Sequence, residues 1–267
     1  MRAYGIPQSV WFTECQTDDI AKKLGIDPLE LRMKNCMPAG FKDPHNGITF
    51  HSYGLKQTME KGAELVHWKE KRAEYDKPQS GEKRRGIGMA IFCYKTGVYP
   101  IALETASARM VLNQDGSAQL FMGATEIGQG ADTVFVQMAA ESSGLRFEDI
   151  YIESTQDTDT APFDTGAYAS RQTYVSGKAC KKVAEEFKRK LIDYAVYMVN
   201  HAVEDFSKTV YLNEVTAAAK AIREAYDLKE DEEITKEMLD VLESEIIEKK
   251  NGKAVLPLRI LADTAFY

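Results

Sequence analysis

The sequence predicts an α+β fold in which mixed sheets are flanked by helices. Apolar residues recur at helical spacing within residues 9–75 and again after residue 175. Between these stretches, two apolar runs flank Asn113-Gln114-Asp115-Gly116, a turn signal typical of a β-hairpin. A glycine-rich loop at residues 123–130 then leads from the second run into a further helical stretch.

The N-terminal part is expected to be helical. A helix over residues 9–24 should end at Gly25 in the left-handed conformation. Asp27 and Pro28 have the residue types of an N-cap and a first helical position, so they should open a short second helix. After a loop rich in proline, glycine and asparagine, a third helix is expected over residues 53–75.

A change in composition marks the best internal boundary. Residues 77–85 (KPQSGEKRR) are polar and charged and contain helix breakers. We therefore expect two domains, a helical one at residues 1–80 and a second one at residues 81–267.

The second domain is expected to combine strands and helices. In chain order, the expected elements are strands at 87–94, 105–112 and 117–122, a helix at 131–143 with Val134, Met138 and Ala139 inward, a strand at 150–154, a long helix from residue 175, helices within 207–252, and a strand at 254–262. The long helix carries an apolar stripe formed by Val175, Ala179, Val183, Phe187, Leu191, Ala195, Met198 and Ala202. We interpret the acidic run at 230–233 as a solvated connector between two helices.

Charge and hydropathy exclude several function classes. The chain has 34 Lys and Arg residues against 41 Asp and Glu residues, so no basic excess is available to neutralise nucleic-acid phosphates. There is no run of about 18 apolar residues that would predict a membrane span. The first residues lack the apolar core of a secretory signal, so we expect a cytoplasmic protein.

The spacing of cysteines and histidines argues against a metal site built from side chains. Cys15, Cys36, Cys93 and Cys180 form no C-x-x-C pair, and the histidines form no H-E-x-x-H motif. We interpret the four cysteines as reduced and mostly buried thiols. An iron–sulfur cluster would need a cysteine set that this sequence lacks.

The first candidate site is the loop Gly123-Ala124-Thr125-Glu126-Ile127-Gly128-Gln129-Gly130. Backbone N–H groups at the start of the following helix can bind an anion, and glycines let a ligand approach the backbone. The loop is not a Walker A motif, because Lys and Ser/Thr do not follow Gly130. Taken alone, a simple tight turn is an equally good interpretation.

The second and third candidates are two further loop segments. Residues 165–173 (TGAYASRQT) combine small and hydroxyl side chains before a helix and can donate several hydrogen bonds. Taken alone, a capping segment with Ser170 or Thr173 as the N-cap is the better interpretation. Residues 2–8 (RAYGIPQ) place an arginine and an aromatic ring in a loop bent by glycine and proline. The alternative for this segment is an ordinary chain start.

Together, the three segments resemble the molybdopterin-binding subunits of the molybdenum hydroxylases, the family of xanthine dehydrogenase and aldehyde oxidase. Residues 2–8 and the stretch IAKKLGIDPLELRMKN are similar to the family's R-G-F/Y-G-x-P-Q loop and A-x-x-L-G-x-D-P-x-x-L-R-x-x-N signature. GATEIGQGADTVFVQMAAESSG is similar to its E-x-G-Q-G-x-x-T segment, and ASRQTYVSGKA to its A-S-R-x-T segment. The resemblance runs from residue 1 to about residue 205, and the point where the chain starts resembles that of a split subunit such as the one in nicotinate dehydrogenase.

The resemblance implies roles for particular residues. Gly128, Gln129 and Gly130 would hold the pterin cofactor, and Ala169, Ser170 and Arg171 would line the molybdenum and bind the cofactor tail. Arg2 and Ala3 would lie beside the metal's ligands, although Ala3 departs from the family's glycine, and Tyr4 would stack on a planar substrate. The metal would be held by the cofactor, with no side chain of this chain as a direct ligand.

The resemblance also implies an activity and partners. An intact enzyme of this family would hydroxylate a carbon of a nitrogen heteroaromatic ring, such as a purine or nicotinate, or of an aldehyde, with oxygen from water. It would use molybdenum bound to molybdopterin in a dinucleotide form, together with iron–sulfur and FAD centres on partner subunits and a second molybdopterin subunit.

Residues 1–80 would complete the first molybdopterin-binding domain, and residues 81–267 would form a second one truncated at its C-terminus. The family's upstream G-G-x-F-G motif and its late G-x-G-E segment, which carries the glutamate base, are absent from these 267 residues, so no catalytic residue is expected in this chain. The alternative is a non-catalytic binding or assembly module that is inactive without its partners.

Overall fold

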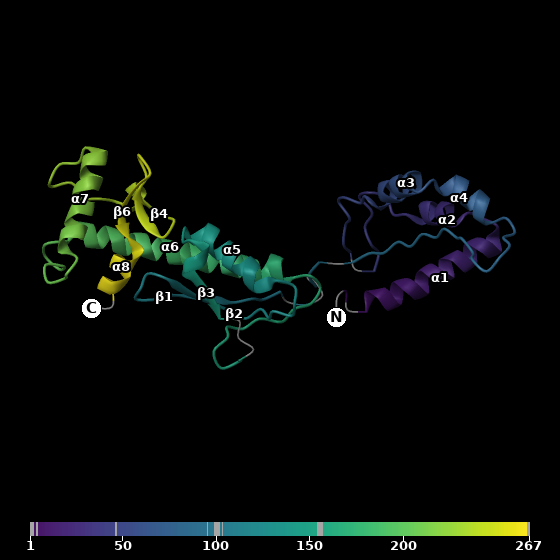
Figure 1. Cartoon of the computed structure of the whole chain (residues 1–267), viewed down its shortest axis with the longest axis horizontal. Helices are drawn as coiled ribbons and strands as arrows, with labels where there is room; N and C mark the ends of the chain where they lie inside the picture. Colours follow the sequence, from purple (N-terminus) through teal and green to yellow (C-terminus); the bar gives the residue numbers. More distant parts are fainter. Residues whose placement is uncertain are drawn as a thin grey trace. The chain divides into compact units, whose positions relative to one another are not determined.

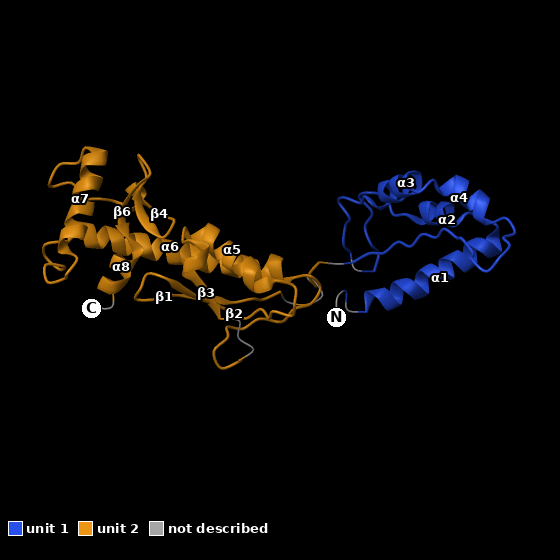
Figure 2. Ribbon diagram, in the orientation of Figure 1, with its two compact units in different colours: residues 1–94 blue, residues 95–267 orange. Residues whose placement is uncertain are grey.

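The computed structural model describes residues 3, 5–45, 47–94, 96–98, 102, 104–153 and 157–265. The chain divides into two compact units, Met1–Tyr94 and Lys95–Tyr267 (Figure 2). The boundary between the units lies after residue 94 rather than near residue 80. The assignment of each part to one molybdopterin domain stays a prediction.

In its described residues, unit 1 contains the helices α1 (Ile6–Leu24), α2 (Pro28–Asn35), α3 (Leu55–Leu65) and α4 (Trp68–Tyr75), drawn in Figure 1. The predicted cap residues are confirmed. Gly25 ends α1 in the left-handed conformation with φ 64°, and the Asp27 carboxylate accepts hydrogen bonds from the N–H groups of Leu29 and Glu30 at the start of α2.

The single helix expected over residues 53–75 is wrong, because two helices meet there at a sharp break. His67 adopts a left-handed conformation with φ 54° between α3 and α4, and a non-glycine residue in that conformation ends the helical hydrogen-bond ladder. After the break Trp68 is buried, and its indole N–H lies 3.2 Å from each carboxylate oxygen of Asp27. The N-cap of α2 thus also fixes α4.

An ion-pair cluster joins α1 to α2. Arg32 is almost fully buried, and its Nε lies 2.9 Å from Glu14 Oε2 while Nη1 lies 2.8 Å from Asp18. Glu14 Oε2 also accepts a hydrogen bond of 2.8 Å from the backbone N–H of Ile91. Residues 87–94 therefore form an extended segment within unit 1, and the strand predicted there is wrong, since they form no ladder with any described strand.

The described part of unit 2 contains two three-stranded sheets. The first has the order β1 (Ala108–Leu112), β2 (Ala118–Met122), β3 (Ile150–Glu153), with an antiparallel β1–β2 hairpin and a parallel β2–β3 pair. The second is fully antiparallel and has the order β4 (Leu239–Leu242), β5 (Glu245–Glu248), β6 (Lys253–Pro257). A mixed sheet and an antiparallel sheet among helices confirm the α+β class.

The helices of unit 2 are α5 (Ala131–Ser143), α6 (Gly177–Asn200), α7 (Leu212–Tyr226) and α8 (Leu258–Ala265). The long helix α6 contacts both sheets as well as α5, α7 and α8, so it is the centre of the core (Figure 1). Its buried side chains include Cys180, Ala184, Leu191 and Met198.

Several details of unit 2 differ from the sequence expectation. The stripe on α6 is right from Phe187 onward, but in its first turns Cys180 and Ala184 are buried in place of Ala179 and Val183. The helix expected late in residues 207–252 is the β4–β5 hairpin instead, and the strand expected at 254–262 ends at Pro257, where α8 begins. In α5, Ala139 is buried as expected, whereas Val134 and Met138 are only half-buried.

The cysteines are unpaired, but they are not mostly buried. Cys15 and Cys93 are exposed, Cys36 is half-buried, and only Cys180 lies in the core. Burial raises the pKa of the Cys180 thiol to about 12, so this side chain packs as a small apolar group. Within the described ranges, no helix is both long and apolar enough to cross a membrane.

Candidate functional site

The candidate site lies where the loop at residues 123–130 follows β2 and enters α5. Gly123 at the end of β2 is packed directly against residues 162–164. A Cβ at this position would collide with the Pro162 carbonyl oxygen and come within 2.8 Å of the Asp164 Cβ. The glycine therefore brings the loop against the residues that lead directly into the second predicted segment, 165–173.

The carboxylate of Glu126 occupies the concave side of the glycine loop. Its Oε1 accepts hydrogen bonds from the N–H groups of Gly128 (2.6 Å) and Gly130 (3.1 Å), and its Oε2 accepts one from Asp132 (3.2 Å). Burial raises the pKa of Glu126, but these backbone donors outweigh burial and lower it below its ordinary 4.5. The N–H groups of Gly128, Gly130 and Asp132, which the sequence predicted to bind an anionic ligand, are thus occupied by a carboxylate of the chain itself.

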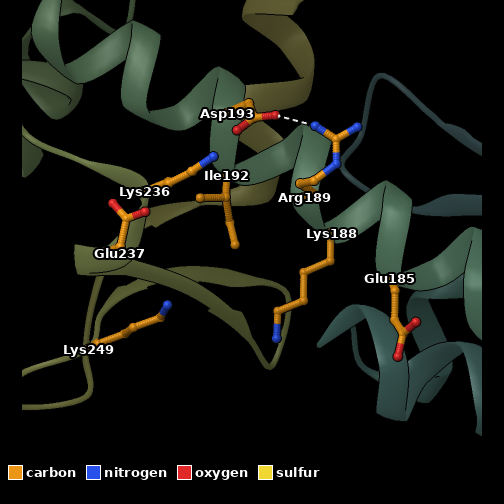
Figure 3. A pocket seen from close by; sticks show the side chains of 8 residues that line it. All are labelled: Glu185, Lys188, Arg189, Ile192, Asp193, Lys236, Glu237 and Lys249. Carbon is orange, nitrogen blue, oxygen red and sulfur yellow. Dashed lines mark hydrogen bonds and ion pairs between the residues drawn. The ribbon is translucent and has the colours of Figure 1, made fainter.

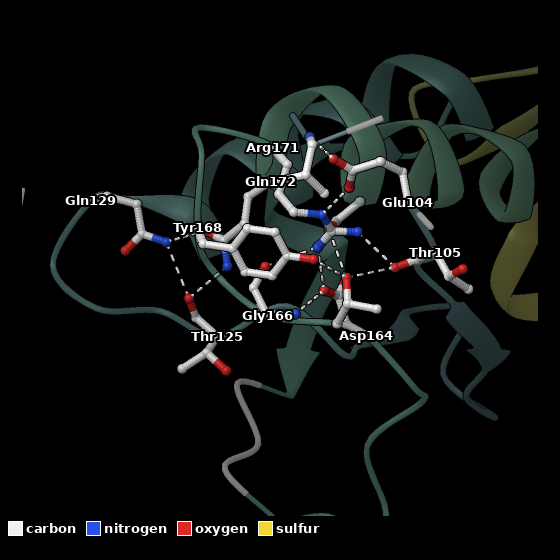
Figure 4. A network of polar contacts seen from close by, with 12 residues as sticks. Glu104, Thr105, Thr125, Gln129, Asp164, Gly166, Tyr168, Arg171 and Gln172 are labelled. Atoms are coloured by element: carbon white, nitrogen blue, oxygen red, sulfur yellow. Dashed lines mark hydrogen bonds and ion pairs between the residues drawn. The ribbon is translucent and has the colours of Figure 1, made fainter. Parts of the chain in front are cut away.

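Gln129 is held by its neighbours on both ends of its carboxamide (Figure 4). Its Nε2 donates to the Thr125 carbonyl (3.1 Å) and to the Gln172 Oε1, while its Oε1 accepts the Ile127 N–H (2.6 Å). Gln172 in turn donates to the same Thr125 carbonyl (2.9 Å). The loop and the residues that precede α6 are therefore joined by one hydrogen-bonded triangle.

Among the described residues, none accepts a hydrogen bond from the backbone N–H of Gln129. Gly128 (φ 92°) and Gly130 (φ 83°) flank it in the left-handed conformation, and a Cβ on either would meet no atom within 4 Å. The loop thus combines a free donor with open space on the side of its glycines.

Arg171 is buried inside a cluster of carboxylates. Its Nε lies 2.5 Å from Glu104, its Nη1 2.5 Å from Asp164, and its Nη1 and Nη2 also donate to the carbonyls of Gly166 (2.9 Å) and Thr105 (2.6 Å). Four of its five N–H donors are thereby engaged. The side chain fixes the segment at 164–172 to residues 104–105. The backbone of Arg171 is engaged as well, because its N–H donates to the Tyr168 carbonyl at 3.1 Å and its carbonyl accepts from the Val175 N–H at 2.7 Å.

The residues next to Arg171 have a conformation that is unusual for their type. Ala169 (φ 47°) and Ser170 (φ 52°) are consecutive left-handed residues without being glycines. The Ala169 carbonyl accepts a 2.7 Å hydrogen bond from Gly97, which holds this turn in place. Such backbone strain is concentrated at functional sites in many proteins.

The N-terminal candidate residues are described only in part. Arg2 and Tyr4 lie outside the described residues. Ala3 is left-handed with φ 62°, which is the conformation that the family's glycine at this position favours.

Sequence reasoning missed three residues that organise the site, namely Glu126, Asp164 and Gln172. Glu126 stands inside the motif and was available as a signal, because a carboxylate shortly before a helix is a good acceptor for its first N–H groups. Gln172 gave no such signal, because its partners Thr125 and Gln129 are far away in the sequence. The Asp164 carboxylate accepts hydrogen bonds from Gly166, Arg171 and Ser176, which follow it closely in the sequence, but this local set was not recognised as a pattern. In the part of the chain that the structure describes, no cluster of three or more histidine, cysteine or acidic side chains could hold a metal ion.

A separate hollow lies between α6 and residues 236–249, away from these loops (Figure 3). Arg189 pairs with Asp193 at 2.9 Å inside the hollow, and Lys188 pairs at 2.6 Å with Asp240, which lies outside the lining. We assign no ligand to this surface hollow.

Comparison with known proteins identifies relatives of the chain. Residues 61–251 match the family described as molybdopterin cofactor-binding domain, and residues 1–36 match a second family of the same description. The xanthine dehydrogenase molybdenum-binding subunit of Escherichia coli O157:H7 is 46% identical over 202 residues, which is 76% of this chain and 27% of that protein. Nicotinate hydroxylase of Emericella nidulans is 28% identical over 222 residues, covering 82% of this chain and 16% of its own length.

A solved structure shares the fold. The aldehyde oxidoreductase from Desulfovibrio desulfuricans superimposes with a TM-score of 0.56 and 31% identity, over 73% of this chain and 21% of that one. The chain therefore spans less than a third of the length of these relatives.

Proposed function

The chain belongs to the molybdopterin cofactor-binding family, and from this premise we propose that it supplies cofactor-binding loops to a molybdenum hydroxylase. The observation that carries the proposal is the loop at 123–130, where the Gln129 N–H has no acceptor among the described residues and the glycines on either side leave open space. A polar, planar cofactor fits such a loop, because it needs hydrogen-bonding partners and a close approach to the backbone.

Each predicted residue has a part in this proposal. Gln129 contacts the cofactor through its backbone N–H and its side-chain oxygen, and Gly128 and Gly130 allow the approach. A second set of contacts comes from the turn before α6, namely Ala169, Ser170 and Arg171. The roles that the resemblance implies for Arg2 and Ala3 toward the cofactor, and for Tyr4 toward the substrate, are part of the same proposal. When bound, the cofactor supplies the molybdenum and its two-electron redox chemistry.

The proposed reaction of the whole enzyme is hydroxylation of a carbon in a nitrogen heteroaromatic ring or an aldehyde. A C–H bond is replaced by C–OH with oxygen from water, and two electrons and two protons leave. We propose that the electrons pass to iron–sulfur and FAD centres on partner subunits, and that a further polypeptide supplies the remaining molybdopterin-binding surface and the acid–base residue. Without those partners the chain is inactive.

The test is the cofactor content of the complex formed on co-expression with partner subunits. Molybdenum and released pterin are measured per chain in the parent, in Gln129→Ala and in Gln137→Ala, a control on the exposed face of α5. Loss of a hydrogen bond to a polar or charged ligand weakens binding by about 1.5–3 kcal/mol, so we expect depleted cofactor in Gln129→Ala alone. Absence of molybdenum and pterin from the parent complex would contradict the proposal.

The role of Tyr4 is tested separately by kinetics. Tyr4→Ala should retain full cofactor but lower kcat/KM strongly, because the planar substrate is no longer held in a reactive orientation. Tyr4→Phe keeps the ring and therefore the stacking energy, which is worth about 0.5–1.5 kcal/mol beyond buried area. Its effect on KM should be modest, because only the hydroxyl is lost. Loss of cofactor in Tyr4→Ala would show that Tyr4 is structural.

A further inference from the structure

The Gln129 side chain retains little freedom to rotate. Its carboxamide has two N–H donors, and both are used, one on the Thr125 carbonyl and one on Gln172 Oε1. Its oxygen accepts the Ile127 N–H at 2.6 Å and retains one further lone pair. If the carboxamide were rotated by half a turn, the Gln129 amide nitrogen would face the Ile127 N–H, and two donors would meet. The Gln129 oxygen would face Gln172 Oε1, and two acceptors would meet. The neighbours therefore specify one orientation.

Gln172 is itself rigidly placed. It is nine-tenths buried, and its own Nε2 donates to the Thr125 carbonyl at 2.9 Å. It begins the π-helical turn Gln172–Ser176 that leads into α6, and it directly follows Arg171, whose guanidinium is anchored to Glu104 and Asp164. Its carboxamide can therefore serve as a fixed template for the more exposed side chain of Gln129 (Figure 4).

We infer that Gln172 is a positioning residue for the cofactor loop. It fixes the Gln129 carboxamide, and with it the backbone from Thr125 to Gln129, so that the remaining lone pair of Gln129 and its free N–H are directed at the ligand. Gln172 does this without needing to contact the ligand itself. The inference rests on the proposed cofactor role of Gln129 and extends that role to a residue outside the glycine loop.

A double-mutant cycle in the assembled complex tests this mechanism. Gln172→Met removes both hydrogen bonds but keeps the length and volume of the side chain, and it is combined with Gln129→Ala. The measured quantity is the rate at which molybdenum and pterin leave the complex during dialysis, with Gln137→Met as the control. We expect Gln129→Ala to accelerate release by about tenfold or more and Gln172→Met by about three- to tenfold. The double variant should be no faster than Gln129→Ala, because Gln172 acts through Gln129.

Hydrogen exchange in the cofactor-free complex reports how firmly the loop is held, without any contribution from cofactor binding. Gln172→Met should accelerate exchange of the Ile127 amide, which donates to Gln129, while the Val134 amide inside α5 stays unchanged. The inference would be overturned, and the cofactor role of Gln129 would stand, if the two substitutions multiplied their effects on the release rate. The same conclusion would follow if Gln172→Met changed neither the release rate nor the exchange of the Ile127 amide. Unchanged release in Gln129→Ala would instead overturn the cofactor role of Gln129, and the inference with it.

Discussion

At the residue scale, Arg171 shows how a residue in a proposed cofactor-binding segment can act from inside the protein. The side chain is fully buried, as is that of Asp164, and Glu104 is nearly so. Two carboxylates placed around one guanidinium need that cation, because a buried charge without a partner is costly. The arginine of the A-S-R segment therefore stabilises the turn on which Ala169 and Ser170 are held.

Replacement of Arg171 by methionine should destabilise unit 2 strongly. Removing one partner of a buried ion pair costs about 3–5 kcal/mol, because the carboxylates remain without a counter-charge. Arg189→Met is the matched control, since Arg189 lies on the exposed face of α6 and its ion pairs with Glu186 and Asp193 are solvent-exposed. We expect a change of at most about 1 kcal/mol for the control. Urea unfolding measures both, and equal effects of the two substitutions would contradict the buried-cluster argument.

The carboxylate of Glu126 makes the stability of the glycine loop dependent on pH. Its native pKa lies below the ordinary 4.5, so ionised Glu126 contributes stability that is fully present above pH 4.5. This contribution is lost as the pH falls below 4.5 through the lowered native value. Glu126→Gln should therefore be less stable than the parent at pH 7, and the difference should shrink as the pH falls below 4.5. Urea midpoints across this range provide the measurement, and a difference that does not vary with pH would show that the charge is unimportant.

At the element scale, the contact between β2 and residues 162–164 depends on a missing side chain. Gly123→Ala places a methyl group against the Pro162 carbonyl and the Asp164 backbone, neither of which can move without separating the two segments. Overpacking of this kind costs about 1–3 kcal/mol. Gly62→Ala is the control, because Gly62 lies within α3 with no atom within 4 Å of an added methyl group, and helix propensity predicts a gain of up to about 1 kcal/mol. Thermal unfolding should shift in opposite directions, and a neutral Gly123→Ala would contradict the close contact.

The elements that could be predicted from sequence are those whose signals are local. Gly25 and Asp27 are caps, and Asn113–Gly116 is a turn, because each conformation is decided by residues within a few positions. The break at His67 and the β4–β5 hairpin were not predictable in this way. His67 is neither glycine nor proline, so its residue type does not indicate a helix break. The turn between β4 and β5 uses Glu243 and Ser244 in the left-handed conformation, and in a highly charged stretch this pair does not indicate a turn.

The same distinction applies to the candidate site. The glycine loop and the A-S-R segment could be found as motifs, since they are contiguous in sequence. The contacts that organise them join residues far apart in the chain, such as Gln129 with Gln172 and Arg171 with Glu104. A single sequence contains no record of these pairings, so the partners of the motif residues emerge only once the fold is known.

At the scale of the whole molecule, the two units differ greatly in their cores. Among the described residues, the buried hydrophobic side chains of unit 1 are Ala21, Met59 and Trp68, whereas unit 2 contains a continuous core around α6. Within the described part of α1, a helix of 19 residues, Ala21 alone is buried. Ordering a residue costs about 1–2 kcal/mol of backbone entropy, so a unit with so few buried side chains needs additional surface to pack against.

The exposed side chains of unit 1 predict how the isolated chain behaves. Trp11 and Phe12 on α1 are 70% and 58% exposed, and Leu65 and Phe92 are 79% and 68% exposed. Apolar side chains of this size on the surface favour association. We therefore expect the chain expressed alone to self-associate or aggregate, and the double substitution Trp11→Gln with Phe12→Gln to reduce this association.

Light scattering after size-exclusion chromatography measures the effect, with Tyr151→Gln on the exposed face of unit 2 as the control. A monodisperse parent chain that unfolds cooperatively would show that the small core of unit 1 is sufficient, and would remove the structural reason for a partner on this unit.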